Sequence, residues 1–116
     1  MLGCGVNIVS HPEDTLYPAT HLHEFNTSVT AVEVLNEFVQ RLSHWRDEWN
    51  VKGAEPIRRA WLDRVKGLGE AITVRTAAAE TTGRFLDLDG DGALILEGSD
   101  GAVSRITTGD VFFESS

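Results

Sequence analysis

The segment from Asp87 to Gly92 carries the acidic spacing of a calcium-binding loop. Asp87, Asp89 and Asp91 fit the first, third and fifth positions of an EF-hand loop, and a glycine stands at the sixth. The twelfth position, which requires a bidentate glutamate, is Gly98. The flanking residues alternate as strands do, whereas an EF-hand needs flanking helices. We therefore predict a hairpin turn made by glycine and aspartate, and no calcium site.

The other side chains that could bind a metal or act as nucleophiles are Cys4, His11, His21, His23 and His44. They show no Cys-x-x-Cys or His-Glu-x-x-His spacing, so we expect solvated loop histidines and no metal site. Cys4 has no necessary histidine partner. No serine lies in a Gly-x-Ser-x-Gly elbow. The sequence therefore predicts no catalytic residue in this chain.

Gly3, Gly5 and Asn7 form the one pattern that favours a ligand. Glycines lack a Cβ and let a strand pass close to a ligand or to another backbone. The asparagine amide both donates and accepts, which matches the edge of adenine. Two interpretations stay open: a nucleotide contact through Gly3, Gly5 and Asn7, or a buried glycine-rich strand that ends in a turn asparagine.

The N-terminal half is expected to contain a strand, a loop and two helices. Residues 2–9 are apolar and strand-like, and residues 10–28 have the composition of a loop. A capping box at Thr30 and Glu33 and apolar residues at helical spacing predict a helix over residues 31–49. A second helix is expected from Pro56 until Gly67 and Gly69 stop it. We assign the aromatic side chains of these helices to helix packing: Trp45, Trp49 and Trp61.

From Glu70 onward the apolar period changes from that of a helix to that of a strand. Five short apolar runs follow, separated by turns such as residues 89–92 and 99–101. We expect these strands to close into a small barrel, because closure leaves no unpaired edge strand. Alternation places four residues in its core: Leu94, Leu96, Ile106 and Phe112. The predicted fold class is α+β, with a boundary that separates residues 1–66 from residues 67–116.

The charge of the chain restricts its partners. The net charge is −8, and residues 67–116, with nine acids and three bases, contribute −6 of it. No basic cluster is present that would hold a phosphate backbone, so we expect no nucleic-acid partner. An acidic module is also a poor match for an anionic membrane surface. Cys4 is the single cysteine, which favours a reducing, cytoplasmic location.

Taken in chain order, five segments resemble the end of the bacterial biotin–protein ligases, that is, the biotin–[acetyl-CoA-carboxylase] ligases. Residues 3–7 resemble the family's G-x-G-x-N strand, residues 11–22 its following loop, and the helix pair ending at Trp61 its last helices. Residues 83–96 and 109–113 are similar to its C-terminal SH3-like domain. The resemblance implies two helices from the end of the catalytic domain, followed by a five-stranded SH3-like barrel.

The resemblance also implies chemistry. Members of this family activate biotin with ATP as biotinyl-5′-AMP and pass the biotinyl group to a lysine of a carboxylase's biotin carrier domain. The nucleotide contact implied for the family's asparagine carries over to Asn7. ATP and biotin are substrates of the full-length enzymes, and we expect neither to be tightly bound by this chain alone.

The catalytic elements of the family are missing from these 116 residues. The G-R-G-R loop and the K-W-P-N-D segment with its lysine would precede Met1, and the only Gly-Arg pair here is Gly83-Arg84. We therefore expect a fragment or truncated product that cannot make biotinyl-AMP by itself. The alternative is a stand-alone, non-catalytic SH3-like module that docks a protein partner. The reading frame upstream of Met1 would distinguish the two.

Overall fold

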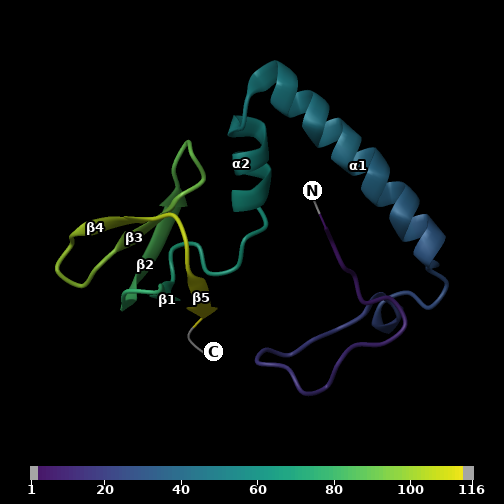
Figure 1. Cartoon of the computed structure of the whole chain (residues 1–116), viewed down its shortest axis with the longest axis horizontal. Coiled ribbons are helices and arrows are strands. Elements are labelled where there is room, and N and C mark those ends of the chain that lie inside the picture. The colour runs from purple at the N-terminus through teal and green to yellow at the C-terminus, as the bar shows by residue number, and fades with distance from the viewer. Residues whose placement is uncertain (1–2, 114–116) are drawn as a thin grey trace. The chain divides into compact units, whose positions relative to one another are not determined.

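The computed structural model describes residues 3–113, and these contain one 3-10 helix, one long and one short α-helix, and five strands (Figure 1). In chain order these elements are the 3-10 helix η1 (Leu22–Glu24), α1 (Ala31–Lys52), α2 (Glu55–Leu62), β1 (Ala71–Arg75), β2 (Glu80–Leu88), β3 (Leu94–Glu97), β4 (Val103–Ile106) and β5 (Asp110–Phe113). The chain divides into two compact units, residues 1–44 and 45–116, which are described separately. The predicted boundary after residue 66 remains a prediction.

Helix α1 begins with the predicted capping box and continues three residues beyond its predicted end at Trp49. The backbone N–H of Thr30 donates to Glu33 Oε2 at 2.8 Å, and the N–H of Glu33 donates to Thr30 Oγ1 at 3.3 Å. These two bonds satisfy N–H groups that lack partners within the helix. At the other end Lys52 Nζ lies 2.9 Å from Glu48 Oε2, where a cation interacts favourably with the helix dipole.

The apolar face of α1 is exposed along its length, and no residue of the helix is buried. Six of its exposed apolar side chains recur at helical spacing: Val32, Leu35, Phe38, Val39, Leu42 and Trp49. The prediction that Trp49 packs within a helix pair is therefore wrong, because 61% of its surface is exposed. We call these six side chains the α1 apolar face.

Helix α2 is shorter than predicted. It ends at Leu62, and turns rather than helix carry the chain through Val65 to Gly69. Gly67 is buried at φ +85°, and a Cβ on it would lie 2.7 Å from Phe113 Cε1. Only glycine fits both conditions, so the chain reverses there to enter β1. Trp61 packs its edge against Phe85 at a centroid distance of 6.2 Å, although 44% of Trp61 is exposed.

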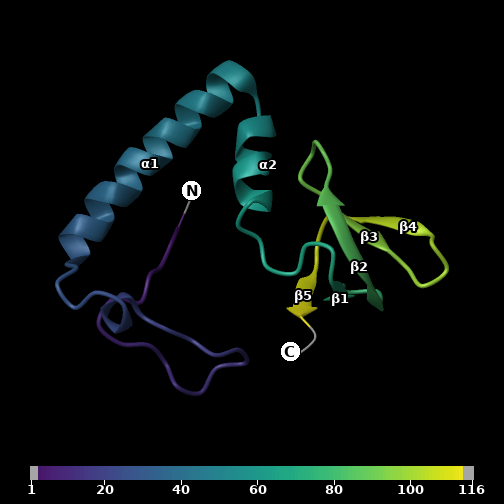
Figure 2. The ribbon, with the colours of Figure 1, turned by 180° about the vertical axis from the view of Figure 1, so that it is seen from behind.

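The five predicted strands are present and form one antiparallel sheet in the order β4-β3-β2-β1-β5 (Figure 2). The predicted turn at residues 89–92 joins β2 to β3, with Gly92 at φ +82°, and that at residues 99–101 joins β3 to β4. A register shift between Phe85 and Asp87 marks a bulge in β2. The pairings within residues 3–113 do not join β4 to β5, so a closed barrel is not observed and remains a prediction.

The core lies on one face of this sheet and consists of Ile72, Val74, Phe85 and Leu96. Of the four predicted core residues, Leu96 is buried, and Leu94 and Ile106 pack against the cluster. Phe112 is a wrong prediction. It pairs with Thr73 on the opposite face, where Arg75 stacks over its ring at 4.6 Å. Its neighbours Val111 and Phe113 pair with Val74 and Ile72 and pack on the core instead.

Among the described residues, no helix combines the length and the apolar composition that crossing a bilayer requires.

Candidate functional site

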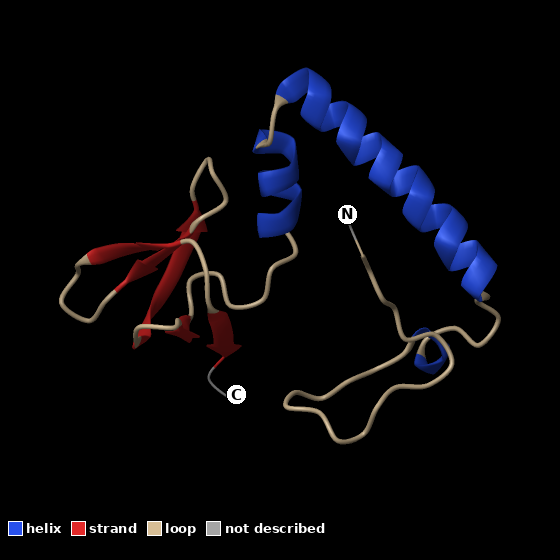
Figure 3. Cartoon of the chain, viewed as in Figure 1, coloured by secondary structure: helices blue, strands red, loops and turns tan. Residues whose placement is uncertain are grey.

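The segment predicted to approach a nucleotide is exposed and is not a strand. Leu2 lies outside the described residues. Residues 3–9 form no strand, and Figure 3 draws them as loop. A strand requires a partner, and the part of the chain that the structure describes offers none to this segment. Gly3 and Gly5 have open space where a Cβ would be, so here they approach neither ligand nor backbone.

Asn7 instead ties the N-terminal segment to the loop that contains η1. The backbone N–H groups of Leu22 and His23 donate to the carbonyls of Asn7 and Ile8 at 3.1 and 2.9 Å. The side-chain Nδ2 of Asn7 donates to the Thr20 carbonyl at 3.2 Å. That bond takes one amide hydrogen, while a base edge would meet the other hydrogen and Oδ1. A structural role and a nucleotide contact are therefore compatible.

The same loop brings two of the four histidines together with an acidic residue that sequence reasoning did not consider. His11 Nδ1 and His21 Nδ1 are 2.7 Å apart, and Glu24 Oε1 lies 3.2 Å from each of them. Both histidines are partly buried. The separation of ten residues between His11 and His21 matches no common metal motif, so only the folded loop reveals the cluster.

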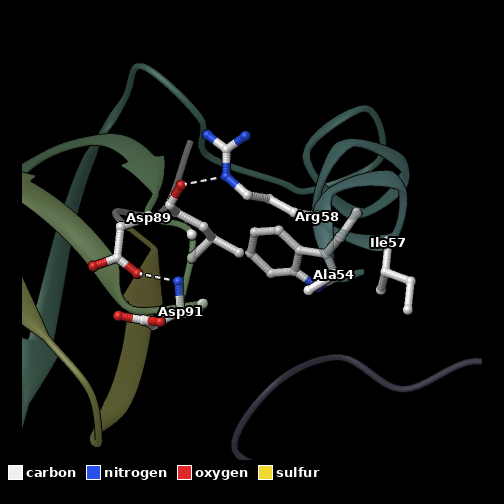
Figure 4. Close-up of a pocket in the computed structure, with 9 residues that line it drawn as sticks. Ala54, Ile57, Arg58, Asp89 and Asp91 are labelled. Carbon is white, nitrogen blue, oxygen red and sulfur yellow. Dashed lines mark hydrogen bonds between the residues drawn. The ribbon is translucent and has the colours of Figure 1, made fainter. Parts of the chain in front are cut away.

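A second candidate site is a groove between α2 and the β2–β3 turn, with a volume of about 560 Å³ (Figure 4). Ala54, which precedes α2, and Ile57 and Trp61 within it form the apolar wall. Leu88 and residues 89–92 form the opposite wall. The groove is open rather than enclosed, so it suits a side chain or a peptide better than a fully buried small molecule.

Arg58 fixes the geometry of this groove. Its Nη2 donates to both carboxylate oxygens of Asp87 at 2.8 Å, and its Nε donates to the Leu88 carbonyl at 2.6 Å. Hydrogen bonds between a guanidinium and a carboxylate are charge-assisted and stronger than neutral ones. Arg58 attaches α2 to the end of β2 and places a positive charge beside Asp87, two residues before the turn.

The remaining acidic residues of the turn are also engaged. Asp89 Oδ1 accepts from the backbone N–H groups of Asp91 and Ala93 at 2.9 and 3.0 Å, and Asp89 Oδ2 accepts from Arg105. The hydrogen bond from Arg105 lowers the pKa of the Asp89 carboxyl, and the two backbone bonds add to this effect. Strands flank the turn on both sides. The carboxylates therefore organise the hairpin, as predicted for a glycine and aspartate turn.

Comparison with known proteins gives one consistent family. Residues 67–114 match the family model described as the biotin protein ligase C-terminal domain. The biotin–[acetyl-CoA-carboxylase] ligase of Paracoccus denitrificans is 35% identical over 118 residues, which cover 97% of this chain and 49% of that protein.

Solved structures show the same fold at lower identity. The biotin protein ligase of Aquifex aeolicus matches with a TM-score of 0.77 and 22% identity, over 96% of this chain and 50% of that one. The same enzyme in complex with biotin and ATP matches with a TM-score of 0.77 over 47% of its length. The chain thus spans about half the length of the relatives it matches.

Proposed function

The chain corresponds to the C-terminal portion of a biotin protein ligase, and on this premise we propose that it completes an ATP-dependent ligase that biotinylates a carboxylase. In the proposed reaction the biotin carboxylate attacks the α-phosphate of ATP and releases pyrophosphate. A lysine amine of the carrier domain then attacks the acyl carbon of the resulting biotinyl-5′-AMP, which forms an amide bond and releases AMP and a proton. The observation that carries the proposal is the match of 35% identity across 97% of the chain.

In this proposal the catalytic half of the enzyme is supplied by the portion of the relatives that these 116 residues do not match. The α1 apolar face supports this division. A contiguous row of large apolar side chains in water marks a surface that packs against another structure. We propose that this face packs against the rest of the catalytic domain, with residues 1–66 as its end and residues 67–116 as the C-terminal domain.

The chain by itself is proposed to be inactive. Lys52 and Lys66 are its only lysines. Lys52 pairs with Glu48, and Lys66 lies over the Phe113 ring at 5.2 Å. Stabilising the charge of an adenylate requires cations placed where that charge develops. Both lysines have other contacts, so the proposal assigns the catalytic lysine to the half of the relatives that this chain does not match. A cytoplasmic location belongs to the same proposal.

We propose that the sheet is part of an SH3-like barrel. Its edge strands β4 and β5 both pack on one core cluster, through Ile106 from β4 and through Val111 and Phe113 from β5. Neighbouring strands lie about 4.8 Å apart, so the edges of a flat five-stranded sheet would be about 19 Å apart. Packing of both edge strands on one cluster of four residues therefore supports strong curling of the sheet. The barrel is proposed to help close over ATP and to dock the carrier domain.

A non-catalytic binding module is the second candidate. The groove beside Arg58 favours it, because an open, apolar-walled groove on a small domain suits a partner's side chain. The two candidates differ in one requirement: the ligase needs the matching catalytic half, whereas the module would bind its partner without it.

The proposal is tested by a chimaera in which this chain replaces the matching half of the Paracoccus denitrificans ligase. We expect the chimaera to biotinylate a carrier domain and the chain alone to release no biotin-dependent pyrophosphate. A folded chimaera without activity would contradict the ligase assignment. Pyrophosphate release by the chain alone would contradict the division into halves.

The role of Asn7 is tested in the same chimaera by Asn7→Ala. A lost donor and acceptor pair facing adenine is worth about 1–3 kcal/mol, so ATP affinity should fall by about ten- to a hundred-fold. Biotin affinity should change little. The matched control is Asn50→Ala, which removes an exposed amide from the last turns of α1. If ATP and biotin affinity fall together with the melting temperature, Asn7 acts only through its bond to Thr20.

A further inference from the structure

The cluster of His11, His21 and Glu24 has the composition of a transition-metal site. Two imidazole nitrogens and one carboxylate oxygen lie within 3.2 Å of one another. Two histidines and one carboxylate are a ligand set found in zinc enzymes with an open coordination position. The sequence predicted no metal site, because the three residues match no known spacing, so the cluster is a product of the folded loop.

The separations of these atoms fit a metal ion. Three atoms 2.7, 3.2 and 3.2 Å apart leave a point about 2 Å from all of them, which is the distance at which Zn²⁺ binds nitrogen and oxygen. Tetrahedral ligands at that distance are about 3.3 Å apart. The distances from Glu24 Oε1 to the two histidine nitrogens already have nearly this value. Only the distance between His11 Nδ1 and His21 Nδ1 has to increase, by about 0.6 Å.

The loop holds the three ligands before any metal arrives. Thr20 Oγ1 donates to Glu24 Oε2 at 3.0 Å, which leaves Oε1 toward the histidines. Bonds of this kind orient metal ligands and tune their affinity. Glu24 follows His21 by three residues on the single turn of η1. The backbone bonds from Leu22 and His23 to residues 7 and 8 anchor that turn to the N-terminal segment.

His23 is not part of the cluster. Its Nε2 lies 2.7 Å from the Val29 carbonyl, so it connects the loop to the approach of α1. An N–H···N hydrogen bond between His11 and His21 is the alternative explanation of their short separation, and the titration below distinguishes the two. A divalent cation contacts all three at once and offsets the negative charge of Glu24.

We propose that His11 Nδ1, His21 Nδ1 and Glu24 Oε1 bind one Zn²⁺ ion, with water in the fourth position. The ion would cross-link the segment after Asn7 to η1 and fix the loop that follows the G-x-G-x-N pattern. This site is independent of the ligase assignment, because it uses only contacts within residues 1–44.

The proposal is tested by isothermal titration of the metal-free 116-residue chain with Zn²⁺, in a Cys4→Ser background that removes the thiol. We expect one ion per chain with micromolar affinity or tighter. His11→Ala, His21→Ala and Glu24→Gln should each weaken binding by at least about 100-fold. Thr20→Val, which removes only the bond that orients Glu24, should weaken it by about ten-fold. X-ray absorption should find two imidazole ligands on the bound zinc.

The matched control is His44→Ala, which removes a histidine of α1 outside the cluster and should leave the affinity unchanged. Glu24→Gln keeps the size of the side chain, and far-UV circular dichroism of α1 verifies that each variant is folded. A wild-type affinity no tighter than that of His11→Ala would mean a hydrogen bond between the histidines only and would overturn the proposal. Equal losses in the His44→Ala control would overturn it as well.

Discussion

Gly83 lies in β2 at a point where the neighbouring strand leaves no room for a side chain. A Cβ at this position would lie 2.6 Å from the Glu97 carbonyl oxygen and 2.8 Å from Leu96 Cγ. The backbone of β3 cannot give way without disturbing the pairs of Arg84 with Glu97 and Phe85 with Leu96. Glycine in a strand often marks such a close approach or a bend at a barrel corner. Gly83→Ala should therefore be a sharp probe of the sheet.

The expected cost follows from this contact. Forcing a methyl group into packed structure costs about 1–3 kcal/mol. Gly90→Ala is the matched control, because it adds the same methyl group to the β2–β3 turn with nothing within 4 Å of the new atom. That substitution should be neutral or should stabilise the chain by up to about 1 kcal/mol through the unfolded state. The two variants differ only in what the methyl group meets.

The measurement is urea unfolding, followed by circular dichroism and by tryptophan fluorescence, to which Trp61 against Phe85 contributes. With a slope of about 1–3 kcal/mol per molar urea, a loss of 2 kcal/mol moves the midpoint down by about 1 M. We expect that shift for Gly83→Ala and no downward shift for Gly90→Ala. Equal midpoints for the two variants would refute the close approach of β2 and β3 at this position.

Three further predictions concern the core, the turn and the α1 apolar face. Phe85 is 2% exposed, so Phe85→Ala should lower the free energy of unfolding by about 3–5 kcal/mol in the same urea assay. Phe112→Ala, on the opposite face of the sheet, should lower it clearly less. The hydrogen bond from Arg105 lowers the folded pKa of Asp89, so this bond stabilises the chain above the unfolded pKa of about 3.9 and is lost as the pH falls through the folded value. Asp89→Asn should accordingly reduce the loss of stability below about pH 4 in melting curves, and an unchanged acid profile would contradict this. The double variant Leu35→Ser, Leu42→Ser should reduce association of the isolated chain in light scattering and should abolish activity of the ligase chimaera. A fully active chimaera would show that the α1 apolar face is not the packing surface.

Local chemistry by itself was enough to predict the two α-helices and the five strands of the sheet, although not where α2 ends. Thr30 and Glu33 predict the start of α1, because a capping box is made by neighbours in sequence. The turn at residues 89–92 was predictable for the same reason, since Asp89 accepts from backbone N–H groups two and four residues ahead. Strand positions followed from turns and alternation, and the resemblance to the ligase family rested on the same short segments.

Tertiary structure alone decided which side chains meet. Val111, Phe112 and Phe113 are three apolar residues in a row, so alternation could not say which of them faces the core, and only pairing with β1 did so. The segment at residues 3–9 reads as a strand, but a strand exists only where a partner supplies hydrogen bonds. The cluster of His11 with His21 and Glu24 has no sequence signal, because a folded loop sets its distances. Residues close in sequence are constrained by covalent geometry, whereas contacts across the fold depend on how the whole chain packs.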